Sequence, residues 1–452
     1  MTPSDFPRIL VVTSNNFNLM TGGGITLTNL FRGWPADRIA NLHEDPAPVD
    51  YTVCHNFYRL SEEEIHWAWP FSLIRGWYRR ATATAGKYGS ASQGTGAVSV
   101  GTRQKDKIWV LLGRRALGGN VPRTVNVTER LGQWLERFNP QILYGFLGSM
   151  AQIRLIREIA QRLRIPVAVH IMDDWPAVIY RRGLLGPLLR RIVQREVDAV
   201  LRLASLHFGI CEDMCTEYRR RYAYTFLPFH NVLDMDEWRP HAKRDWKAGS
   251  PFIVRYVGSI LPNAQREALG DVCEAVTSMR SSGASLEMWV HAPKNQVSYI
   301  QGCALPLDGL HFVDLPPPET IGRLLSESDL LVLPFNFDPS SIQYVRLSMP
   351  TKVPAYMASG TPILVYGPRE MATVRYAERE GWGYVVATSG TASLRKAIGW
   401  LMNDQATRER LGQRAQFLAC EDYDASKIRP TFHAILASAV AKSRIPDDDL
   451  NR

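Results

Sequence analysis

The stretch "RILVVTSNNFNLMTGGGITLTNLF" (residues 8–31) decides the fold class. Residues 8–14 form a compact apolar run that ends in small polar residues, which is typical of a buried parallel strand. Residues 21–31 then place three glycines before apolar residues at helical spacing. A strand, a glycine loop and a helix in this order open a doubly wound α/β unit.

The same alternation continues along the first half of the chain. Apolar runs end in polar residues, and several of them lead into segments with helical spacing. We therefore expect residues 1–240 to form a first Rossmann-like domain. Its further expected strands lie in 141–149, 165–176, 203–222 (with a helix at the basic end) and 226–240, and a further expected helix covers 150–164.

A second alternation begins after residue 250. Residues 241–250 are polar with a Gly-Ser end, which indicates a linker. We expect a second Rossmann-like domain over 251–425, followed by a C-terminal helix and tail over 426–452. Its expected strands lie in 251–260, 286–293, 310–316, 330–335, 361–367 and 383–387. The two halves predict an α/β protein whose two Rossmann-like domains face each other across a cleft.

One segment, residues 61–106, interrupts the pattern with an aromatic and basic part followed by a Gly/Ser-rich part. Tryptophans and arginines mixed over 65–80 suit the headgroup layer of an anionic membrane. The alternative is a hydrophobic excursion that packs on the first domain.

The composition narrows the class of protein and of partner. The 452 residues are 45% hydrophobic and 21% charged, with a net charge of +9, so we expect a globular protein that favours anionic partners. Six scattered cysteines indicate reduced thiols. The N-terminus has no signal-peptide pattern, and no apolar run reaches the length of a membrane span. We expect a cytoplasmic protein, with peripheral attachment to the inner face of the membrane through 65–80 as an option.

Gly22, Gly23 and Gly24 are the first candidate site. Free backbone N–H groups at a helix start let an anion or a sugar hydroxyl approach the main chain. A dinucleotide fingerprint would need glycine at position 27, which is leucine. The alternative interpretation is a flexible turn.

Asp173, Asp174 and Trp175 follow an expected strand of the first domain. Adjacent residues of a strand point in opposite directions, so one aspartate rather than both would face a ligand. Trp175 would stack on a sugar or fill a core. The alternative for the aspartates is a helix N-cap beside a solvated acid.

Phosphate-binding candidates lie in the second half. Ser348, Thr351 and Lys352 supply two hydroxyls and a point charge, which a departing diphosphate needs. The alternative for Lys352 is a surface lysine beside a helix cap. Further candidates follow the first strand of the second domain: Gly258, where a backbone can approach a phosphate, Ser259 and Arg266.

Several motifs now occur in a familiar order. The chain resembles the GT-B glycosyltransferases, most closely the large retaining family four, whose members take sugars from nucleotide diphosphates. The resemblance covers most of 140–390 and is carried by "GICEDMCTEYRRRY…LPFHNVLDMDEWRP" (209–240), "VGSILPNAQREALGDVCEAV" (257–276), "FVDLPPPETIGRLLSESDLLVLPF" (312–335) and "SMPTKVPAYMASGTPILVYGP" (348–368).

The chain also departs from the family pattern. The usual glutamate pair is missing: the glutamate that binds the ribose falls on Ala355, and its companion falls near Leu347. Ser259 replaces a basic residue, and Met172 replaces the histidine of the loop that Asp173 continues. The resemblance therefore supports the scaffold and the phosphate half of the site, whereas the ribose half is altered.

The resemblance implies a glycosyltransferase that moves a hexose-like sugar, with retention, from a nucleotide sugar to a glycan or lipid-linked acceptor in surface polysaccharide or glycoconjugate synthesis. Lys352 would stabilise the departing diphosphate and Asp173 would orient a sugar hydroxyl. Gly258, Ser259, Arg266, Ser348 and Thr351 would bind the donor. The remaining expectations are a nucleobase region at Asp314 and Leu315, an acceptor or phosphate loop at Gly22–Gly24 with Trp175, and no metal ion or cofactor.

Three alternatives remain. A nucleotide-sugar epimerase can share this scaffold. A non-catalytic descendant that binds glycan or lipid would explain Ala355. A nucleic-acid-binding protein is suggested only by the charge, and the sequence shows no arginine–aromatic stripe of a recognised type.

Overall fold

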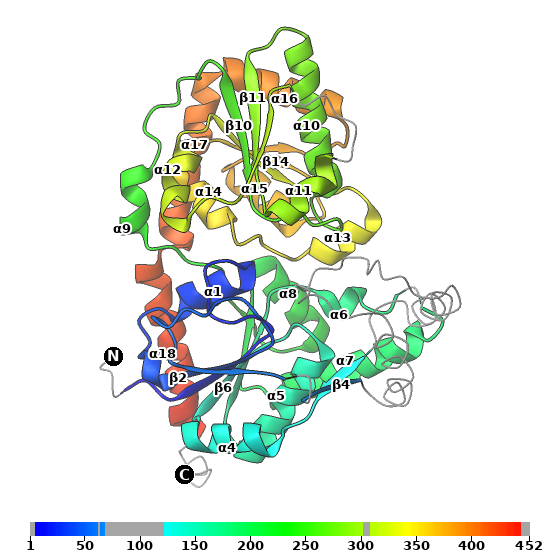
Figure 1. Ribbon diagram of the computed structural model, residues 1–452, viewed down its shortest axis with the longest axis vertical. Coiled ribbons are helices and arrows are strands. Elements are labelled where there is room, and N and C mark those ends of the chain that lie inside the picture. The colour runs from blue at the N-terminus through cyan, green and yellow to red at the C-terminus, as the bar shows by residue number, and fades with distance from the viewer. Residues whose placement is uncertain (1–4, 62–63, 68–121, 182, 302–307, 444–452) are drawn as a thin grey trace, which may run out of the picture.

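The computed structural model describes residues 5–61, 64–67, 122–181, 183–301 and 308–443 (Figure 1). Two lobes are stacked along the long axis, and each is built on a parallel sheet. The first sheet has seven strands in the order β3-β2-β1-β6-β7-β8-β9, and the second has six in the order β12-β11-β10-β13-β14-β15. The predicted α/β class with two Rossmann-like lobes is confirmed.

The strands of the first sheet are β1 (Ile9–Val12), β2 (Ile39–His43), β3 (Asn56–Arg59), β6 (Ile142–Phe146), β7 (Val167–Ile171), β8 (Leu206–Gly209) and β9 (Leu227–Pro228). Those of the second are β10 (Phe252–Val257), β11 (Leu286–His291), β12 (Leu310–Val313), β13 (Leu330–Pro334), β14 (Ile363–Tyr366) and β15 (Tyr384–Val386). The central strands are continuous apolar runs, because helices cover both of their faces. Sequence analysis missed the outer strands β2 and β3.

Helices fill both lobes. They are α1 (Gly22–Phe31), α4 (Glu129–Phe138), α5 (Met150–Leu163), α6 (Trp175–Val178), α7 (Gly186–Leu203), α8 (Glu212–Tyr222), α9 (Met235–Trp238), α10 (Arg266–Ser281), α11 (Lys294–Gln301), α12 (Ile321–Ser326), α13 (Pro339–Val345), α14 (Val353–Ser359), α15 (Ala372–Glu380), α16 (Thr391–Asn403), α17 (Gln405–Asp422) and α18 (Ala425–Ser443). In the described ranges, no helix is long and apolar enough to cross a bilayer.

Both sheets reverse their strand order next to their first strand. In the N-terminal lobe β1 lies between β2 and β6, and in the C-terminal lobe β10 lies between β11 and β13. Ligands of such sheets bind outside the carboxyl ends of the strands at this reversal. The Gly22–Gly24 loop follows β1 and Gly258 follows β10, so both glycine positions lie at a reversal point.

The chain crosses between the lobes twice, and the two crossings are bonded to each other. The N–H of Leu233 donates to the carbonyl of Tyr423 at 2.9 Å, and the N–H of Ala425 donates to the carbonyl of Leu233 at 2.8 Å. Helix α18 then returns to the N-terminal lobe (Figure 1), where His433 contacts the carbonyl of Leu30 at 2.9 Å.

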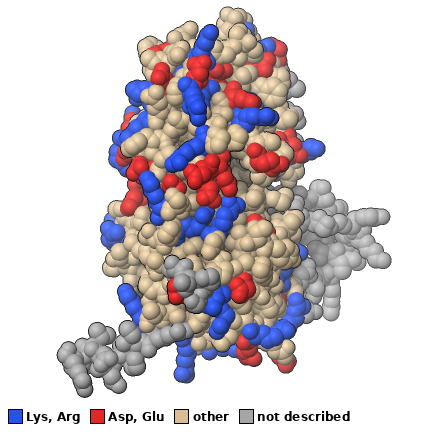
Figure 2. Space-filling model, turned by 90° about the vertical axis from the view of Figure 1, so that its left-hand side faces the viewer, with Lys and Arg blue, Asp and Glu red and all other residues tan. Residues whose placement is uncertain are grey.

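Charged residues reinforce the side of the molecule that carries α9 and α18. Asp234 pairs with Arg32, the residue that follows α1, at 3.3 Å and with Arg429 of α18 at 3.4 Å. Figure 2 shows this side, where acidic and basic side chains adjoin at the waist. The expected linker 241–250 is held along the C-terminal lobe, because Lys243 Nζ donates to two carbonyls of that lobe at 2.9 Å.

The segment 61–106 lies mostly outside the described residues. Its described part includes β4 (Ile65–Trp67), which pairs with β5 (Arg123–Val125) as an antiparallel ribbon. The proposed membrane contact through 65–80 therefore falls largely outside the described residues and remains a prediction.

Candidate functional site

The glycine loop of α1 and the segment 348–352 meet at the seam between the lobes. Thr351 Oγ1 donates to the carbonyl of Gly22 at 3.3 Å. Asn231, from the segment that joins the lobes, donates its side-chain amide to the carbonyl of Thr351 at 3.0 Å. The structure thus brings together two candidates that lie far apart in the sequence.

The three glycines differ in their surroundings. Gly22 is exposed and faces Thr351, whereas Gly24 is buried. A Cβ atom at position 23 would lie 2.4 Å from Asn15 Oδ1, and one at position 24 would lie 2.4 Å from Asn18 Nδ2. Glycine is therefore required at 23 and 24 for packing against asparagine side chains, and only Gly22 opens toward the other lobe.

The ammonium of Lys352 is buried below the end of β10. Nζ lacks any hydrogen-bond partner in the described structure, and it lies 3.9 Å from the ring centroid of Tyr256. A Cβ atom at Gly258, whose φ is +138°, would lie 2.4 Å from Nζ. Burial lowers the pKa of Lys352 from 10.5 to about 7. An unpaired buried cation is costly, so this ammonium is suited to receive an anion.

Asp173 connects the two lobes. Ser348 Oγ donates to its carboxylate at 2.6 Å. Burial raises the pKa of Asp173, and the hydrogen bond from Ser348 partly offsets this increase. Asp173 and Ser348 therefore meet in the seam, and Ser348 lies on the same stretch of the C-terminal lobe as Thr351 and Lys352.

The two residues that follow Asp173 have structural partners. Asp174 accepts two hydrogen bonds from Arg221 at 2.8 Å and one from Tyr218 at 2.9 Å. Trp175 is buried and donates its indole N–H to the carbonyl of Leu147 at 2.6 Å. The structure places Trp175 in the core of the N-terminal lobe, which was the second of the two interpretations made from the sequence.

Two donor-site candidates point elsewhere in this conformation. Ser259 is exposed, and its carbonyl accepts a hydrogen bond from Tyr256 at 2.5 Å. Arg266, at the start of α10, pairs with Glu267 at 2.7 Å. In this structure Arg266 therefore lies on a solvated helix face, which was the alternative interpretation of this residue.

The nucleobase candidates Asp314 and Leu315 are exposed and follow β12. Val257 of β10, His291 of β11 and Val313 of β12 lie in register. Since neighbouring strands are about 4.8 Å apart, Asp314 lies about 10 Å from Gly258 along the same edge.

The positions of the missing glutamates are packed among apolar residues. Leu347 is buried in the cluster that runs through the seam, and its carbonyl accepts a hydrogen bond from Cys211 Sγ at 3.3 Å. Ala355 packs against the same apolar cluster. A carboxylate at position 347 would be buried among apolar side chains, which is costly unless it is paired.

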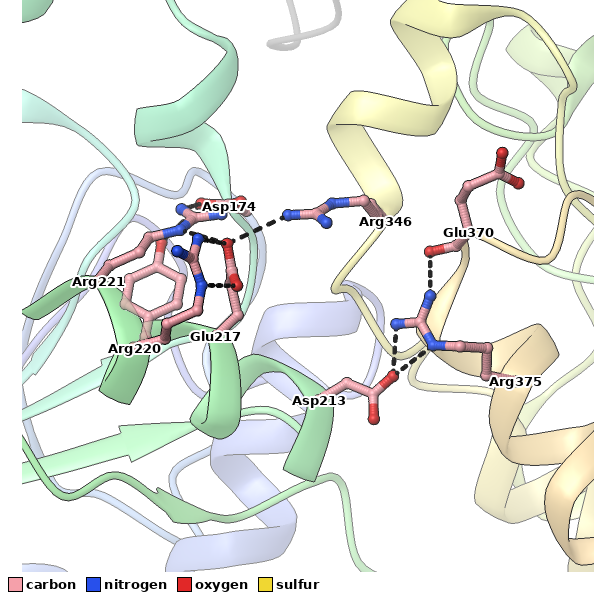
Figure 3. Close-up of polar contacts among 9 residues, drawn as sticks. Asp174, Asp213, Glu217, Arg220, Arg221, Arg346, Glu370 and Arg375 are labelled. Atoms are coloured by element: carbon pink, nitrogen blue, oxygen red, sulfur yellow. Dashed lines mark hydrogen bonds and ion pairs between the residues drawn. The ribbon is translucent and has the colours of Figure 1, made fainter.

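Sequence analysis missed most polar contacts across the seam. His230 contacts the carbonyl of Met349 at 3.1 Å. Figure 3 shows two further contacts: Arg375 bonds Asp213 of α8 at 2.9 and 2.5 Å, and Arg346 approaches Glu217 at 3.5 Å. Each pair joins segments that are distant in the sequence. The only sequence signal for contacts between the lobes was the resemblance around Asn231, in the segment that precedes the linker. Within the described ranges, no group of three or more His, Cys, Asp or Glu side chains is placed to hold a metal ion.

Solved structures resemble nearly the whole chain. Anabaena Alr3699/HepE in complex with UDP and glucose has a TM-score of 0.59 at 12% identity, covering 96% of this chain and 100% of that one. Sucrose-phosphate synthase from Thermosynechococcus elongatus has a TM-score of 0.64 at 13% identity, covering 96% and 99%. A Listeria monocytogenes protein provisionally named UDP-N-acetylglucosamine 2-epimerase has a TM-score of 0.50 at 10% identity, covering 96% of each chain.

No protein-family model matches the sequence, and no curated protein matches it. At identities of 10–13% the structural likeness shows the fold alone. The chain has the two-domain GT-B fold, which nucleotide-sugar glycosyltransferases share.

Proposed function

We propose that the protein is a glycosyltransferase that moves a sugar from a nucleotide diphosphate sugar to a glycan or lipid-linked acceptor, with retention of configuration. The observation that carries the proposal is the buried ammonium of Lys352, which has no hydrogen-bond partner in the described structure and lies beside the glycine that follows β10. A diphosphate at the end of β10 would supply the missing counter-charge.

The residues of the seam have distinct roles in this proposal. Protonated Lys352 donates to the diphosphate and stabilises the charge that develops as the sugar leaves. Gly258 lets the diphosphate approach the main chain. Thr351 and Gly22 bring the lobes together over the donor, which excludes water. Asp173 accepts a hydrogen bond from a sugar hydroxyl in place of the one from Ser348.

Calorimetry with UDP and GDP tests the donor site. UDP is the first probe because the Anabaena structure contains UDP and glucose. Loss of a charge-assisted contact is worth about 1.5–3 kcal/mol, so Lys352→Met should weaken binding about 10- to 100-fold. The matched control is Lys396→Met on α16, whose lysine is exposed and should not affect binding. Equal affinity of the wild type and Lys352→Met would remove Lys352 from the site.

Proton uptake gives a second readout. Because the pKa of Lys352 is about 7 in the free protein, the ammonium is partly deprotonated at pH 8. A bound diphosphate favours the charged form, so binding at pH 8 should take up protons. The apparent binding enthalpy should then vary with the ionisation enthalpy of the buffer for the wild type, and this variation should be absent in Lys352→Met.

The second candidate is a nucleotide-sugar epimerase, which the resemblance to the Listeria protein favours. Incubation with UDP-N-acetylglucosamine and no acceptor separates the two functions. Slow release of UDP supports the transferase, because hydrolysis is its reaction with water. Formation of an isomerised sugar nucleotide would contradict the transferase function and support the epimerase. Absence of UDP and GDP binding would favour the non-catalytic descendant.

A further inference from the structure

A second cavity lies in the N-terminal lobe between α6, α7 and α8. Its volume is about 580 Å³. Five of its lining residues are arginines and one is a carboxylate: Arg181, Arg190, Arg191, Arg220, Arg221 and Glu217. Such an excess of one charge in a concave site attracts ligands of the opposite charge.

The single carboxylate of this cavity is already engaged. Glu217 accepts hydrogen bonds from Arg220 at 2.9 and 3.0 Å and from Arg221 at 2.8 Å. Arg346 of the C-terminal lobe adds a longer ion pair at 3.5 Å. Glu217 therefore cannot neutralise the remaining arginines.

Three arginines of the cavity have no acidic partner among the described residues. Arg190 and Arg191 are exposed on α7, and neither forms a side-chain hydrogen bond or an ion pair with the described residues. Arg181 donates only to the carbonyl of Ala177 at 2.6 Å. These three guanidinium groups therefore leave the cavity with an excess of positive charge.

The cavity adjoins the seam. Pro176 and Ala177 line it and lie three and four residues after Asp173. Arg221, also in its lining, holds the carboxylate of Asp174. Figure 3 shows Glu217 between Arg221 and Arg346, and Arg346 lies two residues before Ser348. One short loop of the N-terminal lobe therefore contributes both to the reaction seam and to the cationic cavity.

We propose that the arginine-lined cavity binds a phosphate group of the acceptor, so that the acceptor of this enzyme is an anionic, phosphate-bearing molecule. The identification of the ligand as the acceptor rests on the proposed glycosyltransferase function, whereas the phosphate-binding site itself does not depend on that function. The planar fork of a guanidinium matches two phosphate oxygens, which makes clustered arginines suited to this ligand.

The phosphate has two possible carriers, a free sugar phosphate or a lipid head group. The segment that supplies Arg181 and Arg190 also exposes Leu184 (86% exposed) and Leu188 (57%). Apolar side chains among basic ones are typical of segments that lie in a membrane interface. The test therefore needs one arm for a soluble phosphate and one for a lipid surface.

The first arm titrates inorganic phosphate into protein saturated with UDP, so that the Lys352 site is occupied. The double variant Arg190→Ala/Arg191→Ala removes two unpaired charges of the cavity. Phosphate affinity should fall about tenfold or more, since each charge-assisted contact is worth about 1.5–3 kcal/mol. The matched control is Arg195→Ala, an exposed arginine of α7 outside the cavity lining, which should bind phosphate like the wild type.

The second arm measures co-sedimentation with phosphatidylcholine vesicles with and without phosphatidylglycerol. Binding that needs phosphatidylglycerol and is lost in the double variant, but not in Arg195→Ala, supports a lipid head group as carrier. Binding of inorganic phosphate without vesicle binding supports a soluble carrier. If neither probe distinguishes the double variant from Arg195→Ala, the proposal is overturned.

UDP affinity separates this proposal from the proposed function. The double variant and Arg195→Ala should both bind UDP like the wild type, because none of the three arginines lies at the seam. Phosphate binding that depends on Arg190 and Arg191 in a protein that does not bind UDP or GDP would overturn the transferase and keep the anion site. Equal melting temperatures of both variants and the wild type would exclude unfolding as the cause of a loss.

Discussion

Two neighbouring aspartates of the same loop have opposite surroundings. Asp174 is bound within its own lobe by Arg221 and Tyr218, through three hydrogen bonds of 2.8–2.9 Å. Among the described residues, the Asp173 carboxylate accepts a single hydrogen bond, from Ser348 of the other lobe. The partly buried Arg221 and the buried Lys352 differ in the same way, since Arg221 has two carboxylate partners and Lys352 has none in the described structure.

The difference distinguishes charged side chains that stabilise the fold through ion pairs from charged side chains that lack such a partner and are suited to bind a ligand. A buried ion pair with satisfied hydrogen bonds fixes the elements that carry it. A buried charge without a partner lowers stability, and its retention favours a functional role. The Arg221 cluster therefore belongs to the scaffold of the N-terminal lobe, and the residues of the seam belong to the candidate site.

The largest expected effect comes from breaking the paired cluster. Arg221→Met leaves the carboxylate of Asp174, which is 2% exposed, without its cation. We expect a loss of about 3–5 kcal/mol in the free energy of unfolding, measured by urea denaturation. Arg220→Met is the control on the same helix, because Arg220 is exposed and its only ion pair among the described residues is with Glu217. Equal losses in both variants would contradict the structural role of Arg221.

Removing the unpaired cation should change the free energy of unfolding in the opposite direction. We expect Lys352→Met to raise the free energy of unfolding by about 1–4 kcal/mol below pH 7, because a buried charge is replaced by an apolar group. The pKa of Lys352 is about 7 when folded and 10.5 ordinarily. The unfolded chain binds more protons between these values, so the wild type gains stability as pH rises and the difference should shrink.

Urea denaturation of both proteins between pH 6 and about 10 checks this sign. Lys396→Met serves as the control, since its lysine is exposed and should show no such pH dependence relative to the wild type. A destabilised Lys352→Met would mean that the ammonium has an anionic partner in the folded protein, which would weaken the comparison with Arg221.

A smaller effect is expected from Ser348→Ala. The variant removes the only hydrogen bond that the Asp173 carboxylate accepts from the described residues, and it should cost about 1 kcal/mol. Loss of this donor raises the pKa of Asp173 further above its usual range. The destabilisation should therefore appear at neutral pH and vanish under acidic conditions, where Asp173 is protonated in both proteins. A loss that does not depend on pH would show that the hydroxyl acts through packing.

The smallest effect is expected from Thr351→Val, which keeps the side-chain shape. The hydrogen bond from Thr351 to Gly22 is 3.3 Å long and solvent-exposed, so its loss should cost about 0.5 kcal/mol or less. Denaturation of Thr351→Val and Ser348→Ala under the same conditions ranks the two contacts across the seam. A larger loss for Thr351→Val would reverse that ranking.

Local patterns predicted the fold far better than they predicted the polar contacts. The buried strands β1, β6, β7, β10 and β13 are apolar runs, so the sequence showed them directly. The outer strand β3 is half-exposed and mixed in polarity, and it was missed. Among the site residues, the sequence placed Thr351 and Lys352 on one short segment, but it gave no sign that Nζ would be buried against Tyr256.

The sequence by itself determined the α/β alternation of both halves, most of their buried strands and the excess of positive charge, because apolar periodicity and composition are properties of short segments. Only the tertiary structure decided which charges are paired. Asp174 meets Arg221 across 47 positions, and Ser348 meets Asp173 across 175. Such pairs form only when the sheets have stacked and buried their edges, because burial is what makes the presence or absence of a partner matter.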